Sequence, residues 1–150
     1  MKKLSAHTKG HSLVELLTAI TILSLITSPF VSSLANVTTA QIKYRHRTQA
    51  TQYAQEALEI AYNLAVNTIN WQTFRQYGDN PDQNYFPFVD ANGFFDLAPG
   101  EETNIKGKFN RSLSFSHKDN GLIVQVEITW QERNQPQEVA ISTYLIEFET

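Results

Sequence analysis

The pattern of hydrophobic and polar positions changes twice along the chain. Residues 16–42 contain no charged side chain, and a stretch of that length can cross a bilayer as a helix, since about 20 residues suffice. Hydroxyl residues interrupt the stretch, but each can bond to the carbonyl oxygen four residues earlier, so a helix tolerates them. From residue 43 to about residue 77, apolar residues recur at spacings of three and four, which predicts an amphipathic helix.

The last third of the chain alternates with a period of two, which is typical of strands. Three such runs begin near Phe109, Leu122 and Val139, and the turn sequences KDNG and ERNQPQ separate them. The pattern predicts an antiparallel meander. We therefore expect an α+β fold, in which a long N-terminal helix with a membrane half and an amphipathic half packs against a three- to four-stranded antiparallel sheet. The alanines of the second half favour a close approach to that sheet.

Between helix and sheet the chain is rich in Asn, Asp, Pro and Gly, which predicts a variable loop. We interpret its phenylalanines as buried anchors rather than as a ligand site; they are Phe86, Phe88, Phe94 and Phe95. The expected organisation is a basic leader at residues 1–10, a hydrophobic helix at 11–42 and one globular domain at 43–150, with helix to about 77, loop at 78–105 and sheet at 106–149.

Charge and composition narrow the function classes. The chain has no cysteine, which removes disulfides and thiol chemistry. Residues 43–150 hold nine basic and fourteen acidic residues, and this acidic surplus argues against DNA binding. One local basic cluster fits a solvated strand and turn better than a polyanion site; it comprises Lys106, Lys108, Arg111 and Lys118.

The acidic residue Glu15 immediately precedes the uncharged stretch. The basic leader before it, residues 1–10, contains three lysines. An ionised side chain within hydrocarbon costs about 2.5 to 3.5 kcal/mol on insertion scales. A carboxylate in this place therefore indicates a functional role.

The junction GHSLVELL, at residues 10–17, resembles the leader junction of the type IV pilin and pseudopilin superfamily. In that family a glycine ends the basic leader, and Ser or Thr, two apolar residues and Glu follow the first mature residue. The resemblance implies cleavage after Gly10 by prepilin peptidase and methylation of the new amino group of His11. It also implies that Glu15 pairs with the N-terminal amine of a neighbouring subunit. Two departures are His11, where the family most often has Phe, and Pro29, which precedes the usual kink position at Ser32.

The resemblance implies partners as well as processing. They are prepilin peptidase, other pilin or pseudopilin subunits, an inner-membrane assembly platform and membrane lipid. The run VQVEITW, a turn and VAISTYL also resembles the end of minor pilins and of the I-type minor pseudopilin of type II secretion. We therefore expect a structural subunit, minor rather than major, of a type IV pilus or of a secretion or competence pseudopilus. It would cross the inner membrane once, with its C-terminal domain outside the cytoplasm, before it joins a filament.

Two other processing fates fit the same N-terminal segment. A conventional signal peptide would use residues 16–26 as its apolar run and Ser33 to Ala35 as its cleavage site, which would release a secreted globular binding domain. An uncleaved anchor would leave that domain attached to the membrane. Lysines and arginines flank the uncharged stretch equally on both sides, so the charge rule alone gives no orientation.

Catalytic and metal chemistry find little support in the sequence, and we expect neither an enzyme nor a cofactor. None of the four histidines lies in a serine, glycine or metal-binding signature. His46, which stands among basic residues after the uncharged stretch, fits lipid headgroups better. A loose calcium site remains an alternative, but turn formation by the same side chains is the stronger interpretation; they are Asp79, Asp82, Asn84, Asp90 and Asp96.

Overall fold

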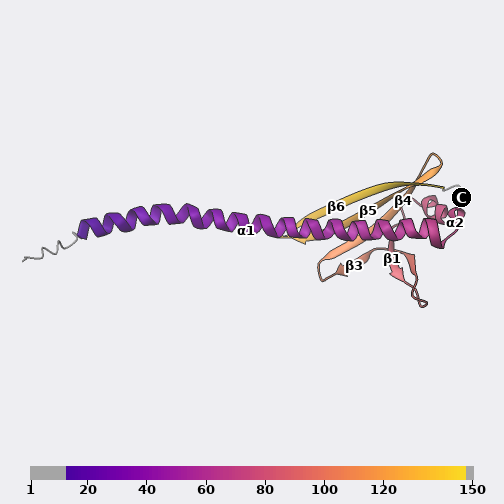
Figure 1. The fold of residues 1–150 in the computed structure, drawn as a ribbon, viewed down its shortest axis with the longest axis horizontal. Coiled ribbons are helices and arrows are strands. Elements are labelled where there is room, and N and C mark those ends of the chain that lie inside the picture. Colours follow the sequence, from indigo (N-terminus) through magenta and orange to yellow (C-terminus); the bar gives the residue numbers. More distant parts are fainter. Residues whose placement is uncertain (1–12, 148–150) are drawn as a thin grey trace, which may run out of the picture. The chain divides into compact units, whose positions relative to one another are not determined.

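The computed structural model describes residues 13–147 of the chain, without the side chain of Thr68. The chain divides into two compact units, Met1–Tyr44 and Arg45–Thr150. Helix α1 (Leu13–Asn63) belongs to both units. The predicted α+β class is confirmed, because one long helix is followed by an open antiparallel sheet (Figure 1).

Helix α1 ends at Asn63, earlier than the expected end near residue 77. A π-helical turn (Leu64–Thr68) follows, and Ile69 then takes an extended conformation with φ −117° and ψ 144°. Asn70 begins a separate short helix, α2 (Trp71–Arg75), by accepting a hydrogen bond from the amide of Gln72 on its side chain. The apolar spacing continues across this break, so periodicity alone misses it, whereas the N-cap asparagine marks it.

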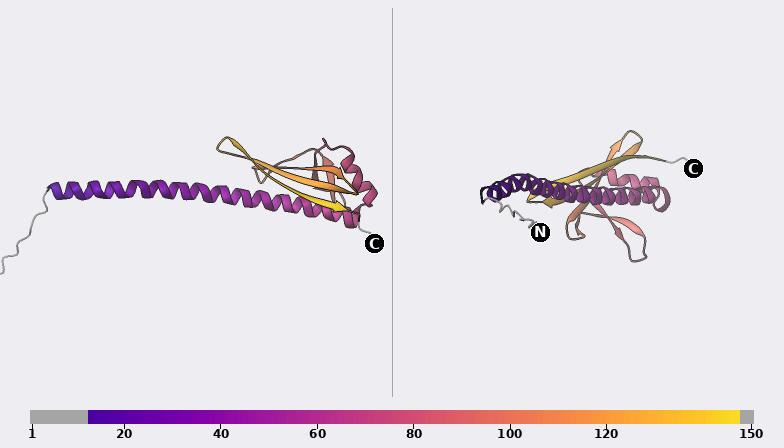
Figure 2. Two further views of the ribbon diagram at one scale, coloured as in Figure 1. Left: turned by 90° about the horizontal axis from the view of Figure 1, so that it is seen from above. Right: turned by 60° about the vertical axis from the view of Figure 1, so that its left-hand side comes forward.

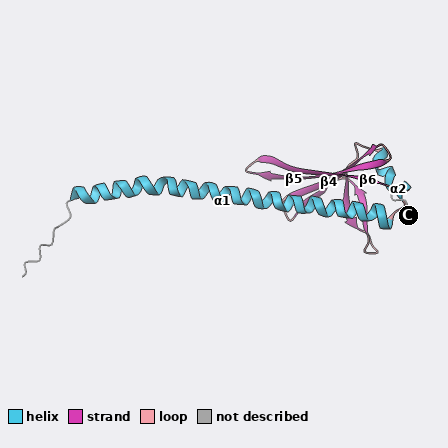
Figure 3. Ribbon diagram, turned by 45° about the horizontal axis from the view of Figure 1, so that its top comes forward, coloured by secondary structure: helices cyan, strands magenta, loops and turns pink. Residues whose placement is uncertain are grey.

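The sheet contains six strands rather than three or four. They are β1 (Tyr85–Val89), β2 (Phe95–Pro99), β3 (Glu102–Ile105), β4 (Phe109–Lys118), β5 (Gly121–Glu132) and β6 (Gln135–Ile146). The order is β2-β1-β4-β5-β6, and β3 also pairs with β4. Strands β4, β5 and β6 form the predicted meander, with Leu113 opposite Val126 and Val126 opposite Ile141. Figure 3 shows the meander as the long strands of the sheet.

The stretch at residues 78–105, expected as a variable loop, contains the 3-10 turn Gln76–Asp79 in part and the strands β1, β2 and β3. Proline and asparagine obscured them in the sequence. Pro87 has no amide hydrogen, yet it is tolerated in β1 because β1 pairs with β4 only at Tyr85, and so the proline lies beyond that ladder. The turn that joins β1 to β2 contains Gly93 with φ 87°.

The core of the globular unit lies between the second part of α1 and the sheet, which run beside each other (Figure 2). Four alanines of α1 are fully buried; they are Ala50, Ala54, Ala57 and Ala61, and Ala65 in the following π-helical turn is 8% exposed. Opposite them, Leu113, Val126 and Ile128 are fully buried. The alanine face therefore belongs to the same buried core as the inner side chains of the sheet.

Aromatic rings close one end of this core. Phe74 of α2 meets Phe115 of β4 edge to face, with ring centroids 5.8 Å apart. Tyr77 then contacts both Phe115 and Tyr85, at 5.3 and 5.0 Å. Helix α2 thus acts as a cap that joins the end of α1 to the sheet.

Candidate functional site

The cleavage and methylation residues of the expected site, Gly10 and His11, lie outside the described residues. The third site residue, Glu15, stands in the first turn of α1. A helix N-terminus carries a partial positive charge, which favours an acidic side chain in the first turn. The sequence therefore places the carboxylate where helix geometry tolerates it, at the edge of the apolar stretch.

A shallow hollow beside Glu15 is lined by apolar side chains of the same helix. Its other lining residues are Leu16, Ala19, Ile20 and Leu23. The small side chain of Ala19 makes room at its centre, and small residues of this kind let helices approach one another closely in lipid. The arrangement places a carboxylate next to an apolar strip, which fits a neighbouring helix that brings a cation to the same level.

Seven hydroxyl residues of the apolar stretch bond to carbonyl oxygens of their own helix. Thr21 Oγ1 donates to the carbonyl oxygen of Leu17 at 2.8 Å, and Ser24 Oγ donates to that of Ile20 at 2.8 Å. Corresponding bonds are made by Thr18, Thr27, Ser32, Thr38 and Thr39. These polar groups therefore need no water, and the helix can present them to lipid or to another helix.

Helix α1 is long and apolar enough to span a membrane. Its large apolar side chains are exposed in the N-terminal unit, among them Leu13 at 76% and Phe30 at 72%. Pro29 lies inside α1, and the helix continues past it. An exposed apolar surface of this extent indicates a second environment, either lipid or other helices.

The globular unit buries one cation, Arg111 of β4, which is 6% exposed. Its Nε donates to Glu102 Oε2 of β3 at 2.9 Å, and its Nη1 lies 3.6 Å from Glu56 Oε1 of α1. The guanidinium thus joins the helix to two strands, as a buried charge with a partner does. The basic cluster expected at residues 106–118 does not form one site, because Arg111 lies in the core and Lys118 lies at the opposite end of β4 from Lys108.

The two histidines of the described part have separate neighbours. His117 Nε2 lies 2.8 Å from Asp79 Oδ1. His46 lies under Lys108, whose Nζ is 2.9 Å from the ring nitrogen Nδ1, and its ring meets Phe109 edge to face. His46 Nδ1 also lies 3.8 Å from Glu132 Oε1. Within residues 13–147, no group of three or more His, Cys, Asp or Glu side chains is arranged to hold a metal ion.

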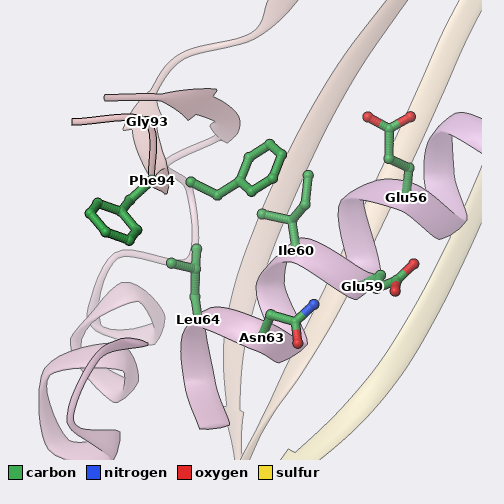
Figure 4. A pocket seen from close by; sticks show the side chains of 8 residues that line it. Glu56, Glu59, Ile60, Asn63, Leu64, Gly93 and Phe94 are labelled. Atoms are coloured by element: carbon green, nitrogen blue, oxygen red, sulfur yellow. The ribbon is translucent and has the colours of Figure 1, made fainter. Parts of the chain in front are cut away.

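An apolar groove of about 360 Å³ lies between α1 and the β1–β2 turn. Figure 4 shows Ile60 and Leu64 facing the turn that carries Phe94, with the carboxylates of Glu56 and Glu59 at the other end. The expectation that the loop phenylalanines are buried anchors is wrong for three of them: Phe88, Phe94 and Phe95 are 36%, 66% and 51% exposed. They lie on a short hairpin at the edge of the sheet, where no further element covers them within the described chain.

Hydrogen bonds support the interpretation of Asp90 as a turn residue. Its Oδ1 accepts from the amides of Phe94, at 2.8 Å, and of Asn92, at 2.9 Å. The bond from the Phe94 amide, more than any other contact, holds the pKa of the Asp90 carboxyl below its usual value.

Tyr77, one of the aromatic residues that close the end of the core, has a hydroxyl group with a raised pKa. The main cause is its burial, and the charge of Asp96 raises the pKa further.

Sequence reasoning missed the buried role of Arg111, the exposed hairpin and the meeting of His46 with Lys108. The alternation of β4 placed Arg111 on the same face as Leu113, which was the available signal for its burial. The meeting of His46 with Lys108 joins segments 62 residues apart in the sequence, whereas the hairpin is a local pairing of residues 85–89 with residues 95–99. Comparisons of the chain with models of protein families, with curated proteins and with solved structures find no match.

Proposed function

We propose that this protein is a structural subunit, minor rather than major, of a type IV pilus or of a type II secretion or competence pseudopilus. Prepilin peptidase cleaves it after Gly10 and methylates His11. The protein crosses the inner membrane through α1, with its globular unit outside the cytoplasm. It then joins a filament through contacts of α1 with other subunits at the assembly platform.

The observation that carries the proposal is the position of Glu15. The carboxylate occupies the first turn of a helix with exposed apolar side chains, five residues after the glycine of the leader junction. A charged carboxylate is costly in lipid, and an amine from a neighbouring helix would stabilise its ionised form. The same residue therefore favours assembly with other subunits.

The architecture of the globular unit supports the same proposal. Alanines of α1 pack on an antiparallel sheet, so the helix is both a membrane-spanning element by length and the spine of the folded unit. The resemblance of the β5 and β6 sequences to minor subunits favours a minor role. The buried Arg111 already has structural partners, which leaves it without a catalytic role.

The N-terminal sequence and intact mass of the protein test the proposal directly. The protein is recovered from membranes of cells that contain a prepilin peptidase and of otherwise identical cells that lack it. We expect a start at methylated His11 in the first cells and an uncut chain in the second. A start at Asn36 in both would establish a conventional signal peptide and a secreted domain. An intact start at Met1 in both would leave an uncleaved anchor.

The variant Glu15→Leu tests the role of the carboxylate. Membrane insertion and cleavage should persist, because the change removes a charge from an apolar segment, while incorporation into filaments should fall at least about tenfold, because the partner amine loses its counter-charge. Thr18→Leu, one turn further along α1, is the matched control and should assemble normally. Sheared filaments and membranes are compared by quantitative immunoblot. Normal incorporation of Glu15→Leu would refute the pairing role.

A further inference from the structure

Three segments that are far apart in the sequence meet at one end of the globular unit. The first is the turn of α1 at residues 45–47, the second is the β3–β4 turn at 106–108, and the third is the β5–β6 turn at 132–134. His46 joins them, since its Nδ1 lies 2.9 Å from Lys108 Nζ and 3.8 Å from Glu132 Oε1. We call this assembly the basic end.

The basic end carries a strong excess of positive charge. Its cations are Arg45, Arg47, Lys106, Lys108 and Arg133, and its one carboxylate within these three segments is Glu132. Lys108 and Glu132 are half-buried, whereas Arg45, Arg47 and Lys106 are exposed. The globular unit as a whole is acidic, so folding collects a minority of basic side chains on one surface.

The backbone of both turns gives an independent indication of function. Lys106 has φ 51° and Arg133 has φ 49°, in the left-handed region that favours Gly, Asn and Asp. The turn at the opposite end of β4 has Asp119 at the corresponding kind of position, with φ 48°, as backbone preference predicts. At both turns of the basic end, a long basic side chain thus occupies a backbone conformation that is unfavourable for it. Such a conformation indicates that the positive charge has a function at this position.

We propose that the basic end binds the anionic headgroup surface of a lipid bilayer. This inference rests on the membrane-anchored subunit proposed above. Arg45 follows the last residue of the uncharged stretch, Ile42, by three positions, so the chain reaches this surface as soon as it leaves the apolar segment. Attraction between basic side chains and an anionic leaflet extends over about one Debye length, roughly 8 to 10 Å. Arg45, Arg47 and Lys106 are exposed, and exposed cations on long side chains suit a headgroup layer better than a protein interface, whose centre is depleted of charge.

The absence of cysteine from the chain allows a site-specific probe. The full chain with Gln131→Cys carries a spin label beside the β5–β6 turn, and Asn120→Cys carries the same label at the opposite end of the sheet. Each protein is reconstituted into vesicles of phosphatidylcholine alone or mixed with phosphatidylglycerol. The measured quantity is the rate of collision between the spin label and a nickel chelate that is attached to lipid headgroups. At position 131 this rate should be higher in the anionic vesicles than in phosphatidylcholine alone, and high salt should lower it again. At position 120 the rate should be the same in both kinds of vesicle.

Charge variants then identify the residues responsible. Arg47→Gln with Lys106→Gln removes two cations from the basic end, and Arg75→Gln with Lys118→Gln removes two from other parts of the globular unit. At about fivefold per cation near an anionic surface, the first pair should lower the ratio of docked to undocked protein by about 25-fold. The second pair should leave that ratio unchanged.

The outcomes separate this inference from the proposed function. In one outcome, the protein stays in the vesicles after carbonate extraction, but the label at position 131 collides equally often in both kinds of vesicle. This result would overturn the binding of the basic end to lipid headgroups and would leave the membrane anchor intact. A protein that carbonate removes would overturn both. A loss of contacts between subunits in the first pair, without any change in lipid proximity, would show that the basic end binds protein and would also overturn the inference.

Discussion

At the scale of residues, the protein separates charges that are buried for structure from charges that are exposed. Arg111 lies in the core with two carboxylates, and Glu102, 33% exposed at its side chain, is its closest partner. A buried cation without a partner is destabilising, whereas a carboxylate that can reach water is less so. The pair is therefore asymmetric, and the two possible deletions should have different effects.

We predict that Glu102→Ala lowers the free energy of unfolding by about 1 to 3 kcal/mol, because it leaves the guanidinium with only its longer contacts to Glu56 and to the carbonyl oxygen of Tyr53. Arg111→Met should cost at most half as much, because an apolar chain of similar length fills the site and Glu102 turns to water. Urea unfolding followed by circular dichroism measures both. An equal or larger loss for Arg111→Met would contradict the asymmetry.

Acid should weaken the β1–β2 turn through Asp90. Its carboxyl has a folded-state pKa below the ordinary value of 3.8, so the stabilising bonds are fully present above that ordinary value and are lost as the pH falls through the folded pKa. The amide protons of Asn92 and Phe94 should shift together in an NMR titration over that acidic range. In Asp90→Ala the same two amides should show no such step, and a step that persists would assign the titration to another group.

At the scale of elements, small residues on α1 decide how close the helix comes to the sheet. Ala50, Ala54 and Ala57 are fully buried, so the interface has no room for larger side chains. The opposite flank of α1 in the globular unit is exposed and carries glutamates and glutamines. The sheet in turn needs the helix, because one of its faces is covered by little else.

We expect Ala57→Leu to destabilise the globular unit by about 1 to 3 kcal/mol, through overpacking against the sheet. Gln55→Leu, on the exposed side of the same helical turn, should change stability by less than about 0.5 kcal/mol. Both are measured by urea unfolding of the protein in detergent. Similar effects of the two substitutions would mean that the helix does not pack tightly on the sheet.

At the scale of the whole molecule, the chain combines two units with different environments. Every buried apolar residue of the described chain lies at Ala50 or later. The N-terminal unit instead exposes its large apolar side chains. One helix thus exposes an apolar surface in its first part and contributes to a hydrophobic core in its second.

We predict that residues 45–150 alone form a soluble, monomeric, folded protein, since they contain the whole buried core. The fragment should unfold cooperatively, and its stability should match that of the globular unit in the full chain within about 1 kcal/mol, as independent sites do. Sedimentation and thermal unfolding by circular dichroism measure this. A fragment without a cooperative transition would mean that the N-terminal unit contributes to the core.

Periodicity by itself determined the helix, the meander of β4 to β6 and the buried alanine face, because these features depend on neighbours three, four or two positions apart. The resemblance of GHSLVELL to a leader junction was also readable from the sequence, since it rests on a local motif, and it stays a prediction. Tertiary structure decided the rest. Arg111 is buried because Glu102 and Glu56 converge on it from other elements, and the basic end exists because three turns meet at His46. Pairing between distant segments is not encoded in any short pattern, and so only the folded chain revealed it.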